Sequence, residues 1–120
     1  MGPMDRRSLG TAAEARAISA LEQAGYKIVE RNVRLRVGEL DAVAWDGDVL
    51  VFVEVRSRAD TRFGGAGQAV GLAKQRQVAR CAEAYLGRSG GALRPRGVRF
   101  DVVAITGADV VILRDAFRAS

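Results

Sequence analysis

The segment that most constrains the fold is a predicted β-hairpin over residues 38–56. Two strand-like stretches flank Asp46-Gly47-Asp48, a sequence typical of a tight hairpin turn. Alternation along the two strands makes one face of the hairpin wholly apolar, whereas the other face is apolar near the turn and charged at its far end. Such a hairpin must be covered on both sides except at one acidic spot, which predicts the centre of a sheet packed between helices.

The rest of the chain supplies the other elements of an α/β domain. The first helix opens on a capping-box pattern, Thr11 to Glu14, and Gly25 is placed to end it. The order α-β-β-β-α-β-β predicts a mixed central sheet flanked by helices, in one domain over 9–118 after a flexible N-terminus over 1–8. The predicted elements are a helix over 11–24, strands over 26–33, 38–45 and 49–56, a helix over 68–86, and strands over 98–106 and 110–117.

Composition narrows the chemistry that such a domain could perform. The chain has no histidine and one cysteine, Cys81, which excludes Ser-His-Asp and Cys-His catalysis, His-ligated zinc and an intrachain disulfide. This cysteine usage is typical of a cytoplasmic protein. We expect no membrane span and no signal peptide, because no apolar run is long enough and none follows the basic N-terminal residues. Catalysis would therefore depend on carboxylates, arginine, the two lysines, hydroxyls or a metal ion.

Asp41 and Glu54 are the most informative pair of side chains in the predicted hairpin. In one register they lie directly opposite each other, in another they are diagonal neighbours, and a three-residue loop would place them on opposite faces. In either of the first two registers the carboxylates repel unless a cation lies between them, which favours Mg²⁺ or Mn²⁺. Glu39 on the same face would supply a third oxygen. The alternative is a set of cross-strand ion pairs in which Arg56 lies opposite Glu39.

Positive charge is concentrated in one stretch of the chain. Residues 56–100 carry a net charge of +8, and arginines outnumber lysines 17 to 2. Because guanidinium groups bind phosphate oxygens through two parallel hydrogen bonds, this stretch predicts a nucleic-acid-binding surface. The alternative is an ordinary solvated surface that is rich in arginine. The residues expected to hold the nucleic-acid backbone are Arg58, Arg62, Arg76 and Arg80.

Short motifs between residues 10 and 105 form an ordered set. They are Gly10-x3-Glu14-Ala15, Gly25-Tyr26, Arg31-Asn32, Gly38-Glu39-Leu40-Asp41, Phe52-Val53-Glu54-Val55-Arg56-x-Arg58, Lys74 and Arg99-Phe100-Asp101-Val102-Val103. This set resembles the YraN-like family of uncharacterised bacterial proteins. That family is considered similar in fold to restriction endonucleases and archaeal Holliday-junction resolvases. The resemblance therefore implies a restriction-endonuclease-like fold and the nuclease motif written PD…(D/E)xK.

The resemblance also implies roles for individual residues. Asp41 and Glu54 would be the metal-binding acids, and by similarity to junction resolvases Glu14 would bring a further carboxylate from the first helix, unless it serves in the capping box. The usual lysine of the motif is Arg56 here. Arginine stays charged at any working pH, so Arg56 could orient water or stabilise charge but could not take a proton. Lys74 could take that role if it points at the acids.

We therefore expect a metal-dependent, endonuclease-like protein that binds DNA, branched DNA included, and cleaves it with Mg²⁺ or Mn²⁺. The alternatives are a non-catalytic DNA- or RNA-binding module of the same fold and a protein–protein adaptor with vestigial acids. The expected partner is a nucleic acid, with a homodimer left open. The candidate catalytic residues are Asp41, Glu54, Arg56 and Lys74, and the candidate metal ligands are Asp41, Glu54, Glu14 and Glu39.

Overall fold

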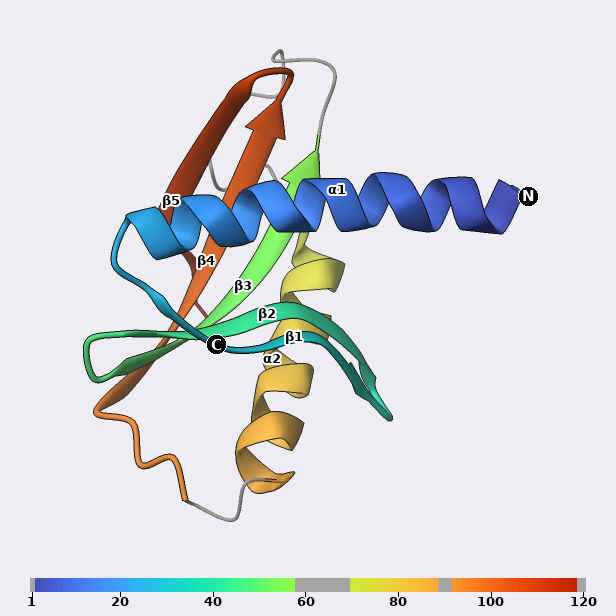
Figure 1. The fold of residues 1–120 in the computed structure, drawn as a ribbon. Coiled ribbons are helices and arrows are strands. Elements are labelled where there is room, and N and C mark those ends of the chain that lie inside the picture. Colours follow the sequence, from blue (N-terminus) through green and yellow to red (C-terminus); the bar gives the residue numbers. More distant parts are fainter. Residues whose placement is uncertain (1, 58–69, 89–91, 119–120) are drawn as a thin grey trace.

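Alternating apolar residues in the middle of the chain form the centre of a five-stranded mixed sheet (Figure 1). The computed structural model describes residues 2–57, 70–88 and 92–118, with side chains from residue 12 onward. The elements are α1 (Gly2–Gln23), β1 (Lys27–Leu35), β2 (Gly38–Asp46), β3 (Val49–Ser57), α2 (Leu72–Arg88), β4 (Gly97–Thr106) and β5 (Asp109–Phe117). The strand order is β1-β2-β3-β4-β5, in which only β3 and β4 run parallel. The predicted order of elements and the mixed sheet flanked by helices are confirmed.

The two helices cover opposite faces of the sheet (Figure 1). Leu21 of α1 packs in one apolar cluster with Val51 and Val53 of β3. Val78 of α2 packs in a second cluster with Phe52 of the same strand. Because successive residues of a strand point to opposite faces, the full burial of all three β3 residues shows that both faces are covered. The two-sided burial predicted from the sequence is therefore confirmed.

The first helix is longer than the sequence predicts. The expected start at Thr11 is wrong, because α1 begins at Gly2 and Thr11 lies in its interior. Pro3 stands in the first turn, where a missing N–H removes no helical hydrogen bond, so the helix can begin this early. The segment from Thr11 to Glu14 is therefore not a capping box, and that role of Glu14 is excluded.

The end of α1 follows the predicted glycine signal. Gly25 has a φ of +99°, a conformation that suits glycine. The Tyr26 N–H donates to the Leu21 carbonyl at 3.0 Å, and the Gly25 N–H donates to the Glu22 carbonyl at 3.0 Å. These two hydrogen bonds form a Schellman motif, which ends the helix and directs the chain into β1.

The described helices are not suited to span a membrane, because none combines the length and the apolar character needed to cross a bilayer. The domain limits at 9–118, the flexibility of residues 1–8 and the cytoplasmic location stay predictions.

A buried polar network joins three strands of the sheet, β2, β4 and β5, to Tyr26 at the end of the first helix. Asp101 of β4 is fully buried and accepts hydrogen bonds from the Tyr26 hydroxyl at 2.6 Å and from two Arg99 nitrogens at 2.8 Å each. Arg99 also donates to Asp46 of β2 at 2.8 Å, and the Asp115 N–H of β5 donates to Asp101 at 3.0 Å. Burial, together with the Asp101 contact, raises the pKa of Tyr26 to about 12, so its hydroxyl stays a donor. Both oxygens of the buried carboxylate are satisfied.

Asp101→Asn is expected to destabilise the fold by roughly 3–5 kcal/mol, because the change leaves the Arg99 guanidinium without its buried partner. Urea unfolding followed by circular dichroism measures the loss. Asp48→Asn is the control, since among the described residues the Asp48 side chain pairs only with Arg96, in an exposed contact at 3.7 Å that is of little energetic value. Equal stability of the two variants would contradict a structural role for the network.

Candidate functional site

The charged end of the β2–β3 hairpin brings Asp41 and Glu54 together. The last register pair before that end is Ala42 with Val53, and the next step of the same register places Asp41 opposite Glu54. This is the first of the two predicted registers that place both carboxylates on one face, and it is confirmed. The charge of Asp41 contributes to raising the pKa of Glu54, as expected of neighbouring carboxylates.

Glu54 is buried and Asp41 is half-buried. Glu54 is 3% exposed, and no described residue forms a hydrogen bond with its Oε2 atom. Burial, and then the charge of Asp41, raises the pKa of Glu54 to about 7. The Asp41 Oδ2 atom accepts a hydrogen bond from the Val55 N–H at 2.8 Å, yet burial still raises the pKa of Asp41. A buried carboxylate oxygen without a partner is rare in native proteins and calls for an explanation such as a catalytic role or a bound ion.

Lys74, in the first turn of α2, points at this acid pair. Its Nζ atom lies 3.4 Å from the Glu54 Oε1 atom, and it donates a hydrogen bond to the Gln77 Oε1 atom, also at 3.4 Å. The positive charge of Lys74 lowers the pKa of both acids and so opposes the effect of burial. The condition under which Lys74 could act in place of Arg56 is therefore met.

Arg56 is close to the acids and does not pair with Glu39. Its charge lowers the pKa of Asp41 and of Glu54, and its buried Nε atom has no hydrogen-bond partner in residues 12–57, 70–88 and 92–118. Glu39 pairs instead with Arg34, at 3.5 Å between Nε and Oε1. The alternative interpretation, which placed Arg56 and Glu39 in one cross-strand ion pair, is wrong in the described part of the chain.

The other two predicted metal ligands lie in different environments. The Glu14 Oε2 atom, on α1, is buried and has no hydrogen-bond partner among the side chains that the structure describes. The Glu39 side chain is 67% exposed and paired, although its charge contributes to raising the pKa of Asp41. Among the described residues, no three Asp, Glu or Cys side chains gather as a group that could hold a metal ion. The described residues therefore bring together a pair of carboxylates, Asp41 and Glu54, and not all four predicted metal ligands.

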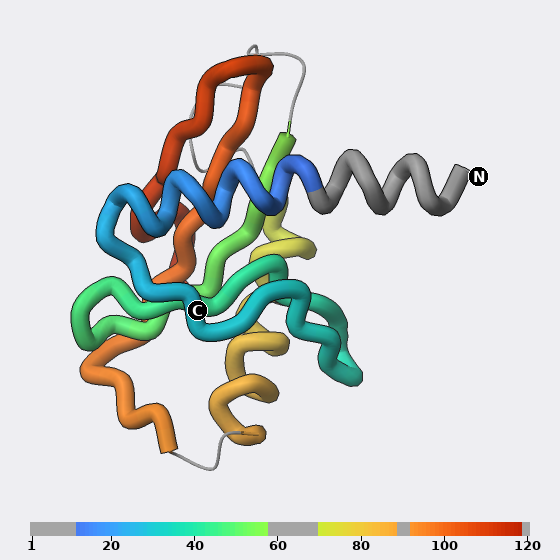
Figure 2. Tube along the Cα trace, viewed as in Figure 1, coloured from blue at the N-terminus to red at the C-terminus, as the bar shows by residue number. Residues whose placement is uncertain are grey.

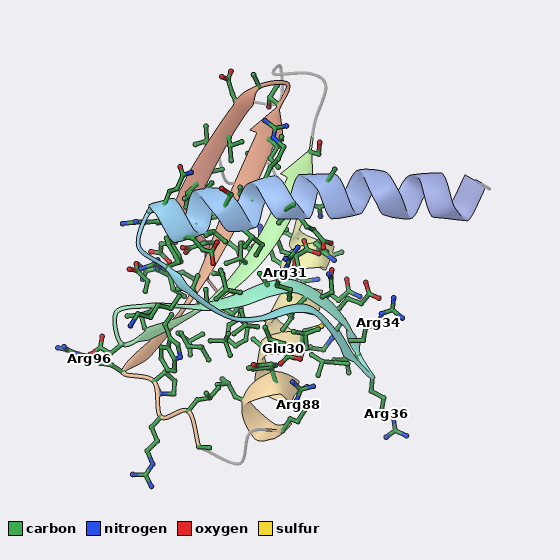
Figure 3. The ribbon with its side chains drawn as sticks, viewed as in Figure 1. Glu30, Arg31, Arg34, Arg36, Arg88 and Arg96 are labelled. Atoms are coloured by element: carbon green, nitrogen blue, oxygen red, sulfur yellow. The ribbon has the colours of Figure 1, made fainter. Side chains whose placement is uncertain are left out.

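The charge of residues 56–100 is divided between several parts of the molecule. Arg99 lies in the buried network and Arg96 pairs with Asp48. Arg88 pairs with Glu30 at 2.9 Å (Figure 3). A single basic face built from the whole stretch is therefore not formed. Of the predicted nucleic-acid-binding residues, Arg76 and Arg80 are exposed on α2 without an ion pair to a described residue, whereas Arg58 and Arg62 lie outside the described residues.

Two residues support the site in ways that the sequence did not predict. Gln77 accepts the hydrogen bond from Lys74, and its position three residues later on one helix was the available signal. Gly38 has a φ of +151°, and a Cβ atom there would lie 2.8 Å from the Gln77 Nε2 atom and 3.1 Å from the Cys81 Sγ atom. The start of β2 therefore rests directly on α2, next to the residue that holds Lys74.

Comparison with known proteins places this arrangement in a family. Residues 13–105 match the sequence pattern of the Uncharacterised protein family UPF0102. The chain belongs to this family. A UPF0102 protein of Burkholderia pseudomallei (strain 668) is 49% identical over 115 residues, which cover 95% of this chain and 78% of that relative. A UPF0102 protein of Symbiobacterium thermophilum is 50% identical over 99 residues, which cover 82% of each chain. Membership of the uncharacterised bacterial family that the motifs predict is confirmed.

Glu54→Gln is expected to stabilise this UPF0102 protein above neutral pH. Because the pKa of Glu54 is raised from 4.5 to about 7 on folding, the unfolded chain loses this proton first as the pH rises. The carboxylate therefore lowers the free energy of unfolding progressively between these two pKa values, by roughly 3 kcal/mol in all, and no further above the folded-state value.

Urea unfolding of the wild type and of Glu54→Gln at about pH 5 and about pH 8 measures this effect. The gain in the variant should be larger at the higher pH. Glu83→Gln, an exposed change on α2, should show the same small effect at both values. An equal gain at both pH values for Glu54→Gln would contradict a raised pKa in the folded protein.

Proposed function

We propose that this protein is a metal-dependent nuclease of restriction-endonuclease-like fold that binds and cleaves DNA. The observation that carries the proposal is the pair of half-buried Asp41 and buried Glu54, with one Glu54 oxygen unpartnered among the described residues and the Lys74 ammonium 3.4 Å away. These acids lie at the charged end of a central hairpin whose middle is packed against apolar side chains on both faces. Such a placement holds charge where the surrounding low dielectric strengthens its interactions, which is typical of an active site.

The donor atoms fit a hard divalent cation such as Mg²⁺ or Mn²⁺. These ions prefer oxygen ligands, and Mg²⁺ is commonly bound through one or two carboxylates while water and substrate phosphates fill its other positions. Asp41 and Glu54 supply two such carboxylates. The Glu54 Oε2 atom, which has no hydrogen-bond partner among the described residues, is available as a ligand. The buried Glu14 oxygen is a further candidate, whereas exposed Glu39 would act through water. A bound ion would polarise the scissile phosphate and lower the pKa of an attacking water.

The chain's own side chains divide the remaining tasks. Lys74 lies within reach of the acids and, in its neutral form, can take a proton from an attacking water. Arg56 stays positively charged and can stabilise the negative charge that develops on the phosphate oxygens. This division assigns the proton transfer to α2 and leaves Arg56, at the lysine position of the motif, as an electrostatic residue.

Arg76 and Arg80 are suited to hold the nucleic-acid backbone. Both side chains are exposed on α2, the helix that also carries Lys74. Contacts from arginine to phosphate position a nucleic acid without reading its sequence. The expected substrates are therefore defined by shape, branched DNA included, rather than by base sequence.

A non-catalytic nucleic-acid-binding module is the second candidate function. Arg56 in place of a motif lysine favours it, because arginine cannot serve as a base. The ion pair between Lys74 and Glu54 also favours it, since this contact neutralises one of the two acids. The two functions differ in cleavage and in metal binding.

Asp41→Asn and Lys74→Ala are each expected to lower the cleavage rate by about 100-fold or more, because one removes a metal-binding charge and the other removes the base. Arg56→Lys is expected to change the rate little. Cleavage of labelled duplex, single-stranded and branched DNA with Mg²⁺ or Mn²⁺ measures the rates. Asp48→Asn, an exposed carboxylate at the other end of the same hairpin, is the matched control and should cleave like the wild type.

Other outcomes would change the assignment. A rate raised by Arg56→Lys and unaffected by Lys74→Ala would move the proton transfer to position 56. If the wild type and Arg56→Lys both bind DNA but cleave none of the three substrates with either ion, the nuclease proposal fails and the binding module replaces it.

Mg²⁺ is expected to raise the Tm of the wild type, and to do so more at about pH 8 than at about pH 6, because the carboxylates must lose their protons to bind it. Glu54→Gln and Asp41→Asn should lose most of this shift, whereas Asp48→Asn should keep it. Thermal unfolding with and without the ion measures the shift. A shift of equal size in Glu54→Gln would place the ion elsewhere.

A further inference from the structure

One residue of β1 has a backbone conformation that is rare within strands. Asn32 has a φ of +51°, in the left-handed region, and it is exposed. Residues held in this region cost energy, and they cluster at active sites and at positions that bind ligands. The site described above gives this residue no role, although the Arg31-Asn32 motif is part of the family resemblance.

Asn32 lies directly opposite Asp41 of the acid pair. Their neighbours on both sides are register pairs, Arg31 with Ala42 and Val33 with Leu40. The step between these two pairs places Asn32 beside Asp41, and the Cα atoms of opposite residues in an antiparallel pair are about 5 Å apart. A group bound to the Asp41 carboxylate is therefore within reach of the Asn32 side chain.

The regular alternation of β2 is broken at Asp41. Leu40 and Val43 both belong to the apolar cluster that packs against α2, whereas Ala42 belongs to the cluster that packs against α1. Residues three apart in a regular strand point to opposite faces, so an irregular step must lie between Leu40 and Ala42. Asp41 is the residue at that step.

The same break occurs in β1 at Asn32. Two side chains of α2 donate hydrogen bonds to the Glu30 side chain, and Val33 packs in the α2 cluster, so these residues also share a face although they are three apart. The left-handed Asn32 lies between them. Because both strands change face at one step, their register is kept, and the two strands bend together on the way to the turn that connects them (Figure 2).

The backbone at this break does not require an amide side chain. Glycine adopts a positive φ most readily, and the chain uses it for that purpose at Gly25 and Gly47. Asparagine tolerates the conformation, but the Asn32 side chain forms no hydrogen bond with any described residue. Within the described part of the chain, its two N–H donors are therefore available to a ligand.

We propose that the Asn32 amide donates a hydrogen bond to a phosphate oxygen of a DNA strand held at the acid pair. This assignment rests on the proposed function, which places a phosphate beside Asp41 and Glu54. Asparagine side chains are among the groups that bind phosphate oxygens and so fix the position of a nucleic acid. β1 is the first strand of the sheet and pairs with β2 alone, so a nucleic acid can approach Asn32 from the sheet edge.

Asn32→Gly separates the amide from the backbone that carries it. The variant should keep a Tm close to that of the wild type, because glycine adopts a positive φ readily. Loss of a hydrogen bond to a charged oxygen should weaken DNA binding by about 10- to 100-fold. The probes are fluorescently labelled duplex and branched DNA. Their affinity is measured by anisotropy with Ca²⁺, which takes oxygen ligands as Mg²⁺ does.

The salt dependence of binding distinguishes a neutral contact from an ionic one. Asparagine carries no charge and releases no counterion from the DNA, so Asn32→Gly should weaken binding equally at every salt concentration. Arg76→Ala removes a charged contact of the proposed function and should make the log–log slope shallower by about 0.9. A slope that becomes shallower in Asn32→Gly would overturn the neutral contact.

Asp115→Gly is the matched control. Asp115 also has a positive φ, +52°, but it lies on β5, at the opposite edge of the sheet from β1. The described contact of its side chain is an exposed ion pair with Arg118. Its replacement by glycine removes a side chain from the same backbone conformation and should not weaken DNA binding.

The contrary outcomes separate this contact from the proposed function. Wild-type affinity in Asn32→Gly, or weaker binding together with a Tm well below that of Asp115→Gly, would overturn the contact and leave the proposed function intact. Absence of DNA binding by the wild type at low salt would overturn both. Weaker binding by Asn32→Gly in a protein that cleaves no DNA would support the contact and contradict only the nuclease chemistry.

Discussion

Burial of the β2–β3 hairpin on both faces is the constraint on which the rest of the structure depends. Each apolar face requires a helix, so α1 covers one side and α2 the other. The charged residues of this hairpin lie toward its two ends. Asp46 pairs with Arg99 beside the turn, and the acid pair lies at the far end, where the first turn of α2 supplies Lys74. The same burial that stabilises the centre raises the pKa of Asp41 and Glu54. The candidate site is thus a direct result of how the core is closed.

The sheet holds two buried carboxylates in very different states. Asp101 receives four hydrogen bonds, including two from one guanidinium group, and it joins strands that are distant in sequence. Glu54 has an ammonium group near one oxygen, and within the described part of the chain its other oxygen has no hydrogen-bond partner. A fully satisfied buried charge is typical of a structural network, whereas a half-satisfied one is costly unless a ligand completes it. This contrast favours Glu54, and not Asp101, as the acid that binds something.

Local patterns predicted the hairpin and the family, but not the contacts that depend on packing. Alternation and the Gly47 turn gave two registers with Asp41 and Glu54 on one face and a three-residue loop that would separate them, and the observed pairing is the first of these. The start of α1 was misjudged because a capping pattern also occurs inside helices. Lys74 reaches the acids because of how α2 packs on the sheet, and Arg99 is separated from the exposed arginines because of where β4 lies within it. The spacing of residues along the chain does not indicate this packing.

The hydrogen bond from the Val55 N–H to the Asp41 carboxylate has a consequence for the speed of any reaction at this site. Here a side-chain oxygen of β2 accepts a backbone N–H of β3, so the hydrogen bond restrains the rotamer of Asp41. The entropic cost of ordering this side chain is then met when the protein folds. An acid held in this way needs no reorganisation as charge develops beside it, which is the condition for rapid turnover in a preorganised site.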